Sequence, residues 1–219
     1  MLFAVSLLLP LPVAALEGEV EDLLSRADYS GSAEARIESV FERADSDDVP
    51  SEFLVPRLAE GVAKGVPGSR VAAVLEGRLD TLLSARRILE DNQYPVAAGQ
   101  SGSRGLWSAA ALLLWDDSPE QHLARLARES GGRRPALRES FSLYASLIAW
   151  GLSRSQALEI GVATLSSDLN VADYPGIVRI LTEARTQRIP IPQVIERIVN
   201  EIPQSGSLSG LRERVIYSD

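Results

Sequence analysis

Apolar residues recur along the chain every three to four positions, which is the period of an amphipathic helix. The clearest stripe runs from Val71 to Leu89 and predicts one long helix that ends near Glu90. Shorter stripes before and after it predict about ten to eleven helices in all, and no stretch shows the alternation of a β-strand. The pattern therefore predicts an all-α fold, arranged as an irregular bundle or as a short solenoid of antiparallel helical hairpins.

Two of the predicted helices meet at Gly65-Val66-Pro67, in the middle of residues 48–89. Glycine readily takes the left-handed conformation that ends a helix, and proline is well tolerated at the first helical position. We expect a second turn of this design at 151–153, followed by a capping box between Ser153 and Gln156. A third turn is expected at 188–190, where no glycine is present.

The hairpin around Gly65 resembles the later one around Arg188. Sliding residues 54–75 onto 177–198 places Leu58 on Leu181, Pro67 on Pro190 and Val71 on Val194. All helical hairpins share one period, so such matches also arise by chance. An internal duplication and a chance similarity both stay open.

The first fifteen residues contain no charged side chain and end in the small residues Val13-Ala14-Ala15. This composition predicts a signal peptide over 1–15 that is cleaved before Leu16, although no Lys or Arg precedes the apolar run. The alternative is that the segment stays attached and buried. The run is too short for a transmembrane helix, which needs about 20 residues. We therefore expect an exported protein, periplasmic or extracellular, with no stable membrane span after processing.

The remaining chain is predicted to form helical hairpins over 16–91, a flexible linker over 92–105 and a C-terminal helical subdomain over 106–219. The linker is predicted from its glycine, serine and proline content. Residues 106–115 are apolar on every side except Ser108. A helix without a polar face is expected to be enclosed, so the pattern predicts that Trp107 and Trp115 are both buried.

Composition excludes several chemistries. A net charge of −8 argues against non-specific nucleic-acid binding, and the absence of cysteine excludes a thiol nucleophile and a thiolate metal site. The single histidine, His122, follows Asp116, Asp117 and Glu120, but one imidazole lacks the usual histidine pair of a metal site. We interpret this segment as an exposed helix start, with a capping box begun by Ser118. We therefore predict no catalytic residue, no metal and no cofactor.

The densest basic stretch lies between 125 and 138 and stands out against the acidic chain. Guanidinium groups bind carboxylates and phosphates well, so this stretch is the best sequence candidate for a binding surface. We expect a binding or scaffold module of the cell envelope, whose partner is another envelope protein or a peptide. A helical enzyme with carboxylates gathered in a cleft is the alternative. The candidate binding residues are Arg125, Arg128, Arg133, Arg134 and Arg138.

Overall fold

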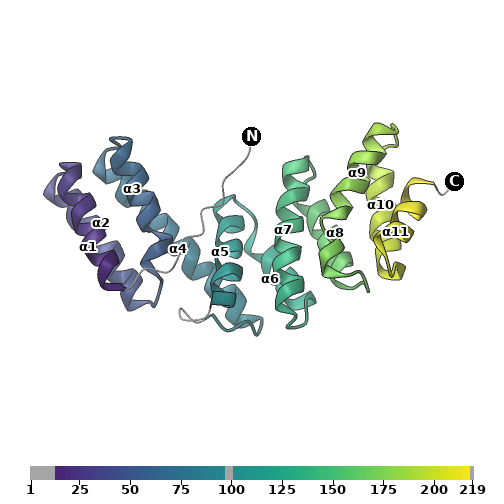
Figure 1. Ribbon diagram of the computed structural model, residues 1–219, viewed down its shortest axis with the longest axis horizontal. Coiled ribbons are helices and arrows are strands. Elements are labelled where there is room, and N and C mark those ends of the chain that lie inside the picture. Colours follow the sequence, from purple (N-terminus) through teal and green to yellow (C-terminus); the bar gives the residue numbers. More distant parts are fainter. Residues whose placement is uncertain (1–12, 97–100, 218–219) are drawn as a thin grey trace. The chain divides into compact units, whose positions relative to one another are not determined.

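The computed structural model describes residues 13–96 and 101–217, and the predicted all-α fold is confirmed (Figure 1). The described residues form eleven α-helices and three short 3₁₀ helices, without a β-strand. The chain folds as two compact units that divide between Asp80 and Thr81, inside α4. The helices are α1 (Val13–Ala27), α2 (Gly31–Ser46), η1 (Ser51–Phe53), α3 (Val55–Ala63), α4 (Gly68–Asp91), α5 (Ser101–Trp115), α6 (Glu120–Glu129), α7 (Arg134–Trp150), α8 (Arg154–Leu165), η2 (Val171–Asp173), α9 (Gly176–Thr186), α10 (Ile191–Glu201), η3 (Ile202–Gln204) and α11 (Leu208–Ile216).

In the first unit, α1 packs against α3, and α2 turns its apolar side chains inward. Exposed ion pairs also join α2 to α4: Arg36 binds Glu76 at 2.7 Å and Arg43 binds Asp80 at 2.9 Å. Such exposed pairs contribute little to stability, about 0–1 kcal/mol each. Burial of the apolar faces therefore holds this unit together.

In the second unit, each helix contacts the next helix but one along the chain. Contacts join α5 to α7, α7 to α9 and α9 to α11, and they also join α6 to α8 and α8 to α10. Consecutive helices, such as α7 and α8, pack together as well. This is the contact pattern of antiparallel helical hairpins stacked on one another.

One turn recurs at six helix ends. In each, a residue with positive φ is followed by a residue whose N–H donates to the carbonyl five positions earlier, as in Val66 to Gly61 and Ile189 to Ala184. This is the bonding of a Schellman motif, which satisfies carbonyls left free at the helix end. Five of the six turns continue with proline. The residues with positive φ are Asp48, Gly65, Gln93, Asp117, Gly151 and Arg188.

The predicted turns at Gly65, Gly151 and Arg188 are thereby confirmed, and so is the capping box between Ser153 and Gln156. Pro67 lies one residue before α4 instead of inside it. The matched hairpins around Gly65 and Arg188 share the turn, and an internal duplication and a chance similarity both stay open.

Exchanging glycine and non-glycine residues at these turns should change stability in opposite directions. Gly151→Ala should lower the free energy of unfolding by about 1 kcal/mol, because alanine must adopt a left-handed backbone. Arg188→Gly should raise it by about 0.5 kcal/mol, because it relieves that strain at an exposed site but adds chain entropy to the unfolded state. Urea unfolding measures both. A lower midpoint for Arg188→Gly would contradict the assigned turn.

The predicted linker and the predicted enclosed helix both need correction. Helix α5 begins at Ser101, so residues 101–105 of the predicted linker are helical, while 97–100 lie outside the described residues. Trp107 is fully buried as predicted, but Trp115 is 38% exposed and Leu112 is 46% exposed. The helix is therefore covered on one side only, and the prediction that both tryptophans are buried was wrong for Trp115.

Candidate binding site

The five arginines of the predicted basic surface differ in their contacts within the protein. Two of them form hydrogen bonds to backbone carbonyls of the protein itself. Arg133 donates to the carbonyls of Ser130 and Leu165, and Arg134 donates to the carbonyl of Pro95. Arg138 pairs with its neighbour Glu139 at 3.1 Å. Arg125 and Arg128, on α6, are both exposed and stay candidates for binding a partner.

His122 is not on an exposed turn, as the sequence suggested, but half-buried in the first turn of α6. Its Nδ1 lies 3.0 Å from the hydroxyl of Tyr144, a fully buried side chain on α7. Ser118 is also buried and hydrogen-bonds to Tyr144, whose pKa is raised by burial. The predicted capping box at Ser118 is absent: α6 is preceded by Pro119 and has no side-chain cap.

Stability should fall in mild acid because of His122. Burial, and then the charges of Arg125 and Arg154, lower the pKa of His122 below its ordinary 6.5. The unfolded chain therefore takes up a proton first as the pH drops, and stability is lost from about pH 6.5 down to the folded-state pKa. Urea unfolding at pH 7.5 and pH 5 should show a smaller loss in His122→Gln. An equal loss in both proteins would contradict this role.

Two carboxylates among the described residues have clearly shifted pKa values. Clear pKa shifts fall on Glu60 and Glu183, and both values are lowered, by hydrogen bonds from Lys64 and Arg57 and from Arg212 respectively. A general acid would instead need a raised pKa. Within the same residues, no three His, Asp or Glu side chains gather so as to hold a metal ion.

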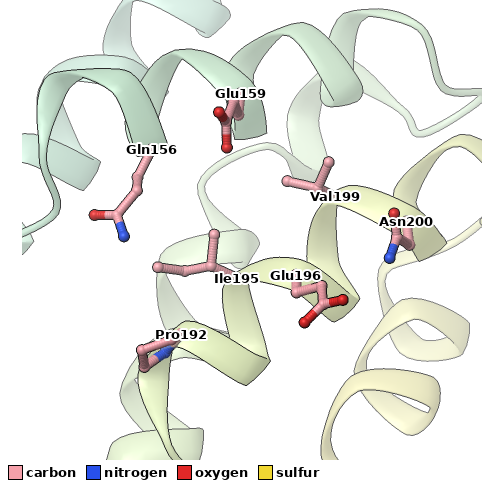
Figure 2. A pocket seen from close by; sticks show the side chains of 7 residues that line it. All are labelled: Gln156, Glu159, Pro192, Ile195, Glu196, Val199 and Asn200. Atoms are coloured by element: carbon pink, nitrogen blue, oxygen red, sulfur yellow. The ribbon is translucent and has the colours of Figure 1, made fainter.

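A groove of about 300 Å³ lies between α8 and α10 (Figure 2). Pro192, Ile195 and Val199 of α10 supply its apolar side chains. Glu159 projects from α8 toward them, and Glu196 and Asn200 extend from α10. The groove combines an apolar floor with a polar rim, which is the usual composition of a site that binds another molecule.

One edge of the groove is fixed by the start of α8. Gln156 lines the groove, and its Oε1 accepts the backbone N–H of Ser153 at 3.1 Å in the capping box. On α10, Ile195 is almost fully buried, which holds the floor in place. Both walls are thus parts of rigid helices, so a ligand would meet a preformed surface.

The sequence analysis missed this groove. The groove residues of α10 lie on one face of that helix, three, four, seven and eight positions after Pro192. This spacing was recognisable in the sequence; the residues are Ile195, Glu196, Val199 and Asn200. Nothing in that spacing says that Gln156 and Glu159, more than thirty residues earlier, lie opposite. The sequence pattern could therefore predict the α10 side of the groove but not the α8 side.

No helix of residues 13–96 and 101–217 is both long enough and apolar enough to cross a membrane. No family model matches the chain, and searches of curated proteins and of solved structures found no similar protein.

Proposed function

We propose that this chain is a helical binding module that holds a segment of a partner protein in the groove between α8 and α10. The groove itself carries the proposal, because it joins buried apolar atoms to an exposed polar rim on two rigid helices. Stacked helical hairpins commonly present such surfaces to peptides. The competing proposal is a helical enzyme with carboxylates gathered in a cleft.

We further propose that the protein acts in the cell envelope after export. The support is the uncharged, apolar sequence of residues 1–15 and the small residues at 13–15. Cleavage after Ala15 would fall in the first turn of α1. N-terminal sequencing of the exported protein should begin at Leu16. Intact Met1 in a cytosolic fraction would contradict export.

Partner capture from envelope extracts tests the groove. Val199→Arg places a long charged side chain on the groove floor and should abolish capture of the partner. Val74→Arg is the matched control, because Val74 is an exposed valine of α4. Proteins retained by the wild type and by Val74→Arg, and lost with Val199→Arg, would support the proposal. Retention of every captured protein by Val199→Arg would contradict it.

A further inference from the structure

We infer that the segment held between α8 and α10 is both apolar and basic, an inference that rests on the proposed function. It would insert an apolar side chain against Ile195 and Val199 and present Lys or Arg to the rim carboxylates. The argument follows from the size of the groove, its charge and the position of the nearest cation.

The size of the groove fits side chains of a peptide. Its volume of about 300 Å³ lies at the lower limit of ligand pockets, which run from about 300 to 1,000 Å³. The floor is apolar, with Ile195 buried and Val199 half-buried. Burying one apolar side chain there removes apolar surface from water, which favours binding.

The charge of the groove selects the partner. Glu159 on α8 and Glu196 on α10 line it, both are exposed, and its lining contains no cationic side chain. Arg197 follows Glu196 directly but donates to the carbonyl of Val215 in α11. Because the groove lining holds two carboxylates and no Lys or Arg, it favours a positively charged ligand and disfavours an acidic one.

Fluorescence anisotropy with defined peptides tests the inference on the full-length protein. The probe is a labelled twelve-residue peptide that alternates leucine and arginine. The two comparison peptides replace every arginine with glutamate or every leucine with serine. We expect binding of the Leu/Arg peptide at 50 mM salt, at least tenfold weaker binding of the serine peptide, and none of the glutamate peptide.

Two double variants with the same change in net charge separate the groove from the general acidity of the chain. Glu159→Gln with Glu196→Gln should weaken the Leu/Arg peptide about fivefold and reduce its salt dependence, since exposed ion pairs are worth little each. Glu38→Gln with Glu42→Gln, on the exposed face of α2, should leave affinity unchanged. Equal weakening by both variants would overturn the inference.

The outcomes also separate this inference from the proposed function. Capture that is blocked by Val199→Arg but unaffected by loss of Glu159 and Glu196 would mean that the groove binds a ligand of another chemistry. Preferred binding of the glutamate peptide would overturn the inference and would point instead to the exposed Arg125 and Arg128 of α6. Binding of none of the peptides would also overturn it.

Discussion

Replacing Trp107 with alanine should lower the free energy of unfolding by about 3–5 kcal/mol, the largest loss that we expect from any single change. The indole is fully buried in the second unit, and its Nε1–H donates to the carbonyl of Leu82 at 2.7 Å. Alanine would leave a large cavity and would remove the hydrogen bond that the indole N–H donates. Urea or thermal unfolding followed by circular dichroism measures the loss.

Trp115→Ala is the matched control on the same helix. Trp115 is 38% exposed, so much less apolar surface is lost and we expect less than about half the effect of Trp107→Ala. Iodide should quench Trp115 fluorescence but not that of Trp107. Equal destabilisation by the two variants, or efficient quenching of Trp107, would contradict the burial described for α5.

The second largest effect is expected at Gly68, the first residue of α4. A Cβ there would lie 2.8 Å from the ring of Tyr29 and 2.9 Å from the Cβ of Ala33. Neither neighbour has a flexible side-chain end that can move away, so Gly68→Ala should lower the free energy of unfolding by about 1–3 kcal/mol.

Gly31 provides the control, because it is the first residue of α2 and a Cβ there meets nothing within 4 Å. Gly31→Ala should therefore leave stability unchanged or raise it by up to about 1 kcal/mol through the lower entropy of the unfolded chain. If Gly68→Ala were as stable as Gly31→Ala, the close packing of α4 on α2 would be wrong.

The number and type of the elements were predictable because they depend on local sequence. Apolar spacing predicted the long helix that ends at Asp91. The turn chemistry was predictable at Gly65 and Gly151 from the glycine, and at Arg188 from the proline two residues later. It was missed at Asp48, Gln93 and Asp117, because a Schellman turn is set by bonding that non-glycine residues can also adopt.

Tertiary features were less predictable. The apolar pattern of α5 predicted an enclosed helix, yet Leu112 and Trp115 are exposed. The spacing of apolar residues does not show which faces of a helix are covered by neighbouring helices. The density of arginines likewise did not show that Arg133 and Arg134 bind backbone carbonyls within the protein. The groove is formed by residues of α8 and α10, which pack against each other in the fold. The apolar pattern of a single helix does not specify which helix packs beside it.

Site-specific photo-crosslinking tests the proposed binding site most directly. A photoreactive amino acid is placed at one of three positions of the full-length protein: Val199 in the groove, Leu112 on the exposed apolar face of α5, or Arg125 on α6. The account predicts a strong adduct with a partner protein from position 199 alone. Adducts from position 112 or 125, with none from 199, would contradict a binding site between α8 and α10.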